Sequence, residues 1–250
     1  MAESYTPGHT PNATDFMSKR SLESHGQFFL PSLAPGLSVL DCGCGPGTLT
    51  LDIADRVTPA KVWGVDFGSS QVETARANAA SRAVGNVEFQ EADCYSLPFA
   101  AATFDRVFSH ALLEHLREPQ KAVAEFHRVL RPGGEVGLCS PDWGGFILAP
   151  PSDNLSRAIE AYQALQSKNG GDVQVGRKLG VLLGETGFEV VHMSARYECY
   201  RSLGLIGEYL ALQLERAGDR KSAESLRAWS CCKGGMFAQA WVAATARKRE

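Results

Sequence analysis

The residues with the clearest chemical potential are an acid and three glycines in one short segment. Asp41 ends an apolar stretch, and Gly43, Gly45 and Gly47 follow it at alternate positions. Glycines at this spacing allow the backbone to turn sharply and to approach a ligand closely, and a helix beginning at Thr48 would add free N–H groups. A dinucleotide site has the spacing G-x-G-x-x-G, whereas the third glycine here comes one residue early. An acid beside such a loop suits a ligand that carries positive charge better than a pyrophosphate.

A second acid follows the next apolar stretch. Asp66 ends the stretch 61–66, and a carboxylate at the end of a second parallel strand can accept hydrogen bonds from both hydroxyls of a ribose. Phe67 comes next and is expected to pack against an adenosine. The competing interpretation is that Asp66 only caps a helix over 69–82, as Asp41 could cap the helix after the glycine loop.

These side chains meet only if the elements that carry them form one sheet. Strand-like and helical stretches alternate, with short connections, from residue 37 to residue 140. This alternation is typical of a parallel sheet covered by helices on both faces, and such sheets bind ligands at the carboxyl ends of their strands. The predicted strands are 37–42, 61–66, 86–91, 104–109 and 134–140, and the predicted helices are 47–56, 69–82 and 117–130.

The pattern changes after residue 140. Prolines and glycines mark an irregular crossing over 141–151, because both residue types interrupt regular structure. The elements predicted beyond it are helices at 152–168, 175–186 and 203–231, a sixth strand at 188–197 and a last strand at 237–246. Several aromatic residues of this half could line a pocket for a flat or lipophilic molecule. They are Trp143, Phe146, Tyr162, Tyr197, Tyr200, Tyr209 and Trp229, with Arg177 among them.

The organisation predicted from these patterns is an N-terminal arm at 1–36 and a domain at 37–250. The domain would carry cap elements at about 141–178 and 199–232. Within the arm, 16–33 has helical character. The polar residues 1–12 could instead form an unanchored tail.

Five segments stand in the order and spacing of a known set of motifs. They are Leu40–Thr48, Val62–Asp66, Glu91–Phe99, Phe104–His110 and Leu130–Gly134. Together they resemble the class I S-adenosylmethionine-dependent methyltransferases, in particular the branch that includes enzymes of ubiquinone and menaquinone biosynthesis. The resemblance implies an α/β, Rossmann-like fold with a seven-stranded, mostly parallel sheet and helices on both faces. In that fold the last strand is antiparallel and lies beside the sixth, with the helical cap between them in sequence.

The resemblance also implies S-adenosylmethionine as the cofactor and assigns residues to it. Asp93 would hold the adenine amino group, with the Cys94 amide near the ring, and Arg20 would reach the cofactor carboxylate. The Ser109 carbonyl is a predicted contact of the cofactor amino group, which Asp41 would hold directly or through water. The alternatives are a loop cap for Asp93 and a solvated helix charge for Arg20.

His110 is the candidate for a catalytic base beside the acceptor. The unperturbed pKa of histidine suits proton removal near neutrality. A purely structural histidine is the alternative. Transfer from a sulfonium needs mainly orientation of the two reactants, so the reaction does not require a base.

Composition narrows the function further. The chain has 250 residues, a net charge of -3 and no long basic block, which disfavours a nucleic-acid substrate. No apolar run approaches the ~20 residues that span a bilayer, and the N-terminus lacks a signal peptide, so a cytoplasmic location is expected. The cysteines have no zinc-type spacing, and no metal is expected.

The sequence therefore predicts methyl transfer to a small-molecule acceptor by in-line displacement. A non-catalytic S-adenosylmethionine-binding regulatory protein and a nicotinamide oxidoreductase of similar architecture are the alternatives. The acceptor, the choice among O-, N- and C-methylation and the oligomeric state stay open.

Overall fold

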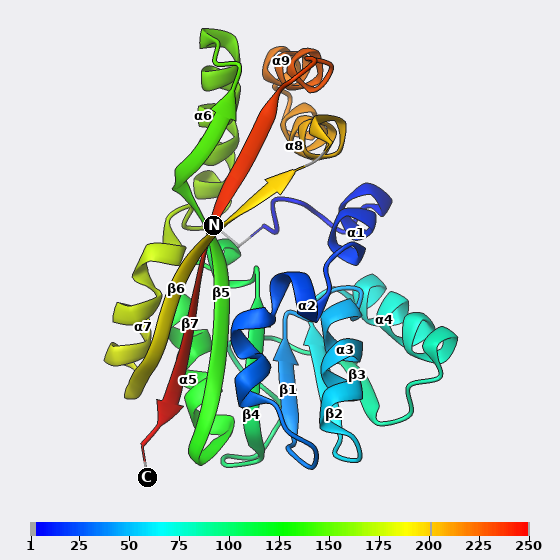
Figure 1. Ribbon diagram of the computed structural model, residues 1–250, viewed down its shortest axis with the longest axis vertical. Coiled ribbons are helices and arrows are strands. Elements are labelled where there is room, and N and C mark those ends of the chain that lie inside the picture. Colours follow the sequence, from blue (N-terminus) through cyan, green and yellow to red (C-terminus); the bar gives the residue numbers. More distant parts are fainter. Residues whose placement is uncertain (1–3, 201, 250) are drawn as a thin grey trace.

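The computed structural model describes residues 4–200 and 202–249. Residues 1–3 of the predicted arm and residue 201 of the predicted cap lie outside the described residues. A seven-stranded sheet in the order β3-β2-β1-β4-β5-β7-β6 forms the centre of the molecule (Figure 1). The strands from β3 to β5 pair in parallel, whereas β7 runs antiparallel to β5 and β6. The predicted fold class is confirmed.

The first half of the chain alternates as predicted. The strands are β1 Val39–Cys42, β2 Val62–Asp66, β3 Val87–Glu91, β4 Phe104–His110 and β5 Leu130–Ala149, and the helices are α3 Thr48–Val57, α4 Ser69–Arg82 and α5 Pro119–Val129. Every residue of β1 is buried, as expected of a strand covered on both faces. Helices α3 and α4 pack on one face of the sheet and α5 on the other, so the strand ends are held rigidly where a ligand would bind.

The second half departs from prediction at the crossing after residue 140. β5 does not end there but continues to Ala149, paired with β7 Met236–Lys248 and interrupted between Asp142 and Ile147. The strand tolerates the prolines and glycines of this segment because its pairing is irregular there and because β7 is its only neighbour beyond Cys139 among the described residues. The extended strands rise beyond the carboxyl edge of the sheet and carry the cap (Figure 1).

The cap has its own hydrophobic core. Helices α6 Asp153–Lys168, α8 Leu203–Arg216 and α9 Arg220–Ser230 pack together there. The predicted helix 203–231 is divided, because Gly218 adopts a left-handed conformation with φ of 91° and Asp219 caps a new helix. Helix α7 Leu179–Glu185, preceded by a 3₁₀ turn at Val175–Lys178, packs instead against the main sheet.

The arm consists of short helices rather than one helix over 16–33. They are α1 Pro11–Ser18, α2 Leu22–His25 and a 3₁₀ helix Gln27–Ser32. Helix α1 ends before this segment, and Ser21 begins a new helix as the N-cap of α2. The Ser21 hydroxyl accepts a hydrogen bond from the Ser24 N–H at 3.2 Å. Helix α1 lies over the carboxyl edge of the sheet, between α4 and α8 (Figure 1).

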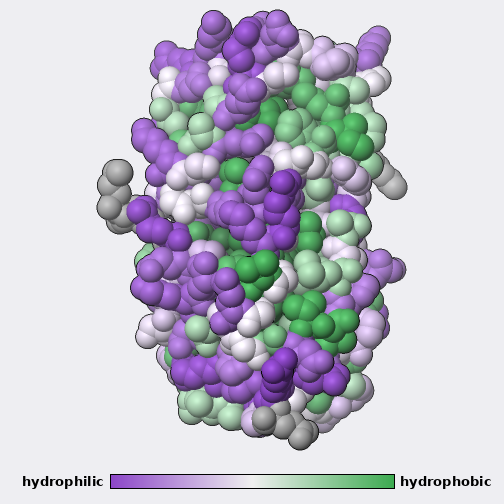
Figure 2. Space-filling model, turned by 90° about the vertical axis from the view of Figure 1, so that its left-hand side faces the viewer, coloured by the Kyte–Doolittle hydropathy of each residue, from purple (hydrophilic) through white to green (hydrophobic). Residues whose placement is uncertain are grey.

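β6 Phe188–Tyr200 is an edge strand of the sheet. Figure 2 looks onto the side of the molecule that carries β6 and α7, where hydrophobic and hydrophilic residues are intermixed. Val190, Val191 and Met193 of this strand are exposed. Charged neighbours along the strand, such as Glu189, interrupt the apolar surface, which lowers the tendency of an edge to pair with another chain.

Candidate active site

A cavity of about 670 Å³ opens at the carboxyl edge of the sheet, a size typical of a cofactor site. The glycine loop, the ends of β2 and β4 and the arm surround it. The predicted cofactor residues that line this outer cavity are Arg20, Gly43, Gly45, Asp66, Phe67, Asp93 and Cys94, and His110 lines it as well. The topology thus brings residues from distant parts of the chain to one place.

Asp66 fixes the shape of the glycine loop. Its Oδ2 accepts a hydrogen bond from the Gly45 N–H at 2.9 Å, and its Oδ1 accepts one from the Gly68 N–H at 2.9 Å. Each carboxylate oxygen has two lone pairs, so both can accept a further hydrogen bond from a ligand. Phe67 beside it is 74% exposed at the rim of the cavity.

Three of the predicted cofactor residues do not line the cavity. Asp41 is buried and its Oδ2 accepts a hydrogen bond from the Thr50 hydroxyl at 2.6 Å. Gly47 lies beneath the loop, where a Cβ would come within 2.9 Å of Ala75 and of Phe89. Ser109 is buried, and its hydroxyl donates to the Cys42 carbonyl at 2.9 Å. Asp41 and Ser109 hold the strand ends in place, and Gly47 allows α4 and β3 to pack closely.

The arm forms the roof of the outer cavity. Tyr5 and Met17 line it and are joined by a hydrogen bond of 3.5 Å from the Tyr5 hydroxyl to the Met17 Sδ. Gln71 of α4 donates to the Thr14 hydroxyl at 2.9 Å. Two side chains of the cap region also bind the arm. Arg216 donates to the Pro7 carbonyl and to the Thr10 hydroxyl, and Asn169 donates to the Thr6 hydroxyl. Residues 4–12 are therefore anchored, not an unanchored tail.

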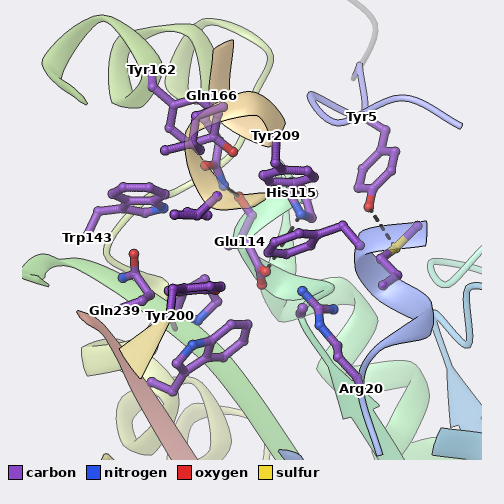
Figure 3. A pocket seen from close by; sticks show the side chains of 17 residues that line it. Tyr5, Arg20, Glu114, His115, Trp143, Tyr162, Gln166, Tyr200, Tyr209 and Gln239 are labelled. Carbon is purple, nitrogen blue, oxygen red and sulfur yellow. Dashed lines mark hydrogen bonds and ion pairs between the residues drawn. The ribbon is translucent and has the colours of Figure 1, made fainter. Parts of the chain in front are cut away.

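A second, smaller cavity adjoins the first beneath the cap, and we call it the inner chamber (Figure 3). It has a volume of about 50 Å³. Seven aromatic residues form a large part of its wall: Tyr5, Phe16, Trp143, Tyr162, Tyr200, Tyr209 and Trp241. Of the aromatic residues predicted for a pocket, Phe146 and Trp229 instead pack in the cap core, Tyr197 is exposed, and Arg177 forms an ion pair with Asp142 at 2.7 Å.

The inner chamber also contains polar groups that have no hydrogen-bond partner within the described part of the chain. These buried atoms are Glu114 Oε2, His115 Nδ1, Gln239 Oε1 and Trp241 Nε1. Unpaired buried polar atoms are rare because each costs free energy. Their concentration here indicates a site for a polar ligand or for water. Glu114 is not among the site residues predicted from the sequence, although it stands beside His115 and four residues after the segment Phe104–His110.

His110 is buried between aromatic rings. Its ring stacks on Trp241 with centroids 4.8 Å apart, and neither ring nitrogen has a partner among the described residues. Burial, and then the positive charge of Arg20, lower the pKa of His110 well below its usual range. The imidazole is therefore neutral at physiological pH and a weak proton acceptor, which disfavours the predicted role as a base.

Two buried acids make the folding stability depend on pH. Burial raises the pKa of both the Asp41 and the Glu114 carboxyls to about 7. Between about pH 4 and pH 7 these two groups therefore bind more protons in the folded state than in the unfolded state, so their contribution to the free energy of unfolding falls as the pH rises, by a few kcal/mol. Urea unfolding of the unmodified protein and of Asp41→Asn across this range isolates the Asp41 share. We expect the stability of Asp41→Asn relative to the unmodified protein to rise with pH, and a difference independent of pH would contradict the assignment.

Comparisons with known proteins agree with this geometry. The model of the family "Methyltransferase domain" matches residues 39–134. The chain is 31% identical to the O-methyltransferase resE of Aspergillus sclerotiorum over 74% of the chain and 67% of that protein. It is 38% identical to a demethylmenaquinone methyltransferase of Lactococcus lactis over 40% of each chain. A 37.1 kDa protein of a Streptomyces fradiae transposon is 30% identical, and the match covers 84% of this chain but 61% of that protein.

The fold is shared with solved structures. The YcgJ protein of Bacillus subtilis superimposes with a TM-score of 0.64 at 18% identity, over 90% of this chain and 97% of that one. With the sequence relatives, this shows that the chain belongs to the class I S-adenosylmethionine-dependent methyltransferases, and S-adenosylmethionine is the cofactor of this class. The predicted family and cofactor are confirmed. Within the described residues, no helix is both long and apolar enough to cross a bilayer.

Proposed function

We propose that the protein transfers a methyl group from S-adenosylmethionine to a small-molecule acceptor by in-line displacement. One observation carries this proposal: the outer cavity and the inner chamber share a wall. Its residues are Tyr5, Met17, Arg20, Ala111 and His115. Ligands in the two cavities would meet at this wall, and holding two reactants in contact supplies most of what a direct transfer needs.

The outer cavity fits the cofactor. A Cβ on Gly45 would lie 3.7 Å from Met17 Sδ and 3.9 Å from Gln71 Oε1, so the glycine leaves open a space between the loop and the arm. The Gln71 Oε1 is buried and lacks a partner within the described residues. Acidic groups line the same cavity, as does the guanidinium of Arg20, which has no ion-pair partner among the described residues. This donor set complements a ligand that carries hydroxyls, an ammonium and a carboxylate.

We infer the following roles from this fit. Asp66 would accept from the ribose hydroxyls, with Phe67 covering the adenosine. Asp93 and the Cys94 amide would hold the adenine. Arg20 would pair with the cofactor carboxylate. Asp41 acts only indirectly, by holding the start of α3 through Thr50.

The bound cofactor supplies a methyl group on a positively charged sulfur, which becomes a neutral thioether on transfer. The protein orients the acceptor and excludes water. The arm, which forms the roof of the outer cavity, would serve both purposes. The Tyr5 ring of the arm contacts the His115 ring, with centroids 4.7 Å apart, and so covers the wall that the two cavities share.

The proposal is tested in two steps on the full chain. Calorimetry with S-adenosylhomocysteine should show binding, and incubation with labelled S-adenosylmethionine and a panel of metabolites should show label transfer. Binding without transfer to any acceptor would favour the non-catalytic alternative. Several relatives are named as O-methyltransferases, which favours transfer and favours oxygen as the accepting atom. A cytoplasmic location and the exclusion of nucleic-acid substrates stay predictions.

The arm should respond to the cofactor. We expect Arg20→Gln to weaken S-adenosylhomocysteine binding about 10-fold, because a charge-assisted hydrogen bond contributes about 1.5 kcal/mol or more. Limited proteolysis should cut residues 4–20 more slowly when the ligand is bound to the unmodified protein, and Arg20→Gln should reduce this protection. Lys19→Gln is the matched control, since Lys19 pairs at the surface with Asp15. Equal cutting with and without ligand would refute closure of the arm.

A further inference from the structure

Glu114 is a buried acid held rigidly at the wall of the inner chamber. Glu114 is 2% exposed and lies in a 3₁₀ turn, Leu113–His115, which follows β4. The Glu114 backbone carbonyl accepts hydrogen bonds from the Gln166 side chain and from the Asp172 N–H, both at 3.0 Å. Because the backbone is fixed from both sides, the carboxyl group has a defined position in the chamber.

The carboxyl itself is poorly satisfied. Its Oε2 has no partner in the described part of the chain, and its Oε1 lies 3.6 Å from the His115 Nε2. Burying such a group costs free energy, which the Ser140 hydroxyl and the Arg20 charge offset only in part, because the pKa of the carboxyl is still raised. Figure 3 shows the Glu114 carboxyl and the Arg20 guanidinium pointing into the same space.

The groups that face this carboxyl come from the arm, the cap, its own turn and β5. The charged or titratable ones are Arg20 and Tyr5 of the arm, Tyr162 of α6, Tyr209 of α8, and His115. From β5, the Ser140 hydroxyl acts on the carboxyl and lowers its pKa. Burial lowers the pKa of His115 to about 3 and raises the pKa of Tyr209 to about 12, so neither changes its charge near neutrality. Glu114 is the group in the chamber whose protonation changes there, since burial raises its pKa to about 7.

We propose that Glu114 is the catalytic base and that the acceptor presents an acidic hydroxyl, of the phenol or enol type, to the inner chamber. This inference rests on the proposed function. The aromatic walls are suited to a flat reacting group. A cationic amine is disfavoured because the Arg20 guanidinium already lies 6.0 Å from the centre of the Phe16 ring and 5.5 Å from that of Trp241. The same cation would stabilise a developing phenolate.

The size of the chamber sets a further condition. Its volume of about 50 Å³ accommodates roughly three to five water molecules, enough for the hydroxyl end of a ring. Admission of a whole ring therefore requires the arm to move, since Tyr5 and Phe16 of the arm form part of the wall.

The step is balanced in atoms and charge. The acceptor hydroxyl gives its proton to Glu114 Oε2, and its oxygen forms the new bond to the methyl carbon as the bond from that carbon to sulfur breaks. The products are the methyl ether, neutral S-adenosylhomocysteine and a protonated Glu114. Release of that proton to solvent restores the carboxylate when the arm opens.

The test compares Glu114→Gln with Glu118→Gln, the same substitution at an exposed position four residues on, where the acid pairs with Lys121. A panel of phenols, their methyl ethers and matched aromatic amines is offered with labelled S-adenosylmethionine. The unmodified protein should methylate phenols, with kcat rising through an apparent pKa near 7. We expect Glu114→Gln to lose about 100-fold in kcat and to lose this pH dependence. Glu118→Gln should retain both.

Two binding measurements separate this inference from the proposed function. S-adenosylhomocysteine affinity in Glu114→Gln should stay within about threefold of the unmodified protein. With S-adenosylhomocysteine present, 4-nitrophenol should bind the unmodified protein and ionise at lower pH than in solution, as its visible absorbance reports, whereas 4-nitroanisole gives the background. This second measurement tests the acidic-hydroxyl acceptor and the Arg20 cation even if Glu114→Gln does not fold.

Failure of the unmodified protein to bind S-adenosylhomocysteine overturns the proposed function. Binding of S-adenosylhomocysteine with methylation of amines instead of phenols, or with no ionisation of 4-nitrophenol, overturns this inference alone. Full activity of Glu114→Gln with an unchanged pH profile removes Glu114 as the base.

Discussion

Replacing Asp66 with alanine is expected to weaken S-adenosylhomocysteine binding about 30- to 150-fold, equivalent to about 2–3 kcal/mol. The variant would lose the charge-assisted hydrogen bonds to the ribose. It would also leave the N–H groups of Gly45 and Gly68 without their present acceptor. The effect therefore combines a lost ligand contact with a loosened glycine loop.

Calorimetry on folded protein measures this loss, and Asp66→Asn separates its two parts. The asparagine retains one carbonyl acceptor, so it should preserve more of the loop and lose less affinity than the alanine variant. Asp55→Ala is a control at an exposed ion pair with Arg82, away from the cavity. Unchanged affinity in Asp66→Ala would exclude Asp66 from the site.

Gly47→Ala is expected to lower the free energy of unfolding by about 2–5 kcal/mol. The residue has φ of 79°, a left-handed conformation that costs an L-residue roughly 1–2 kcal/mol. A Cβ would also come within 2.9 Å of Ala75 Cβ and of the Phe89 ring, and overpacking of this kind costs about 1–3 kcal/mol. The main effect should thus be on folding, not on a direct cofactor contact.

Gly36→Ala is the matched control for this substitution. Gly36 also has a left-handed φ, 88°, but a Cβ there would meet nothing within 4 Å. It should therefore show only the backbone cost of roughly 1–2 kcal/mol. Chemical unfolding of both variants gives the difference. Equal losses of stability would mean that the packing of Gly47 against α4 and β3 contributes nothing.

The inner chamber contains groups that lower the stability of the fold but are suited to binding a polar ligand. Polar atoms of Glu114, Gln239 and Trp241 are buried without partners among the described residues, and each such group costs stability. Such costs are tolerated where function requires the group. Substitutions in the chamber should therefore affect turnover more than stability, in contrast to Gly47→Ala.

The parts of the fold that have strong local signals could be predicted from the sequence alone. Buried strands such as Val39–Cys42 are short, mainly apolar runs, and the glycines and acids that follow them in the sequence indicate the ends of the strands. The family pattern gives the order and direction of the strands. Together, these two signals predict that Asp66 and the turn at Gly43 and Gly45 lie at the carboxyl edge of the sheet. Arg20 and Asp93 also line the cavity, and their contacts with the cofactor stay predictions.

The direction of each side chain, in contrast, depends on the packing of the whole fold. Asp41 lies one residue before the end of β1, and its side chain points toward Thr50, because the alternation of a strand assigns it to the face covered by α3. Gly47 belongs to the loop in sequence but lies against Phe89 in space. These orientations depend on which helices and strands pack against each face of the sheet, and the local sequence pattern does not predict those neighbours.

The same reason explains why Glu114 and the continued β5 were not found. The direction of the Glu114 side chain depends on contacts of its turn with Gln166 and Asp172, far along the chain. β5 continues past its local breakers because β7, almost a hundred residues later, supplies its hydrogen-bond partners. Long-range pairing outweighs local preference there, and it builds the cap that encloses the inner chamber.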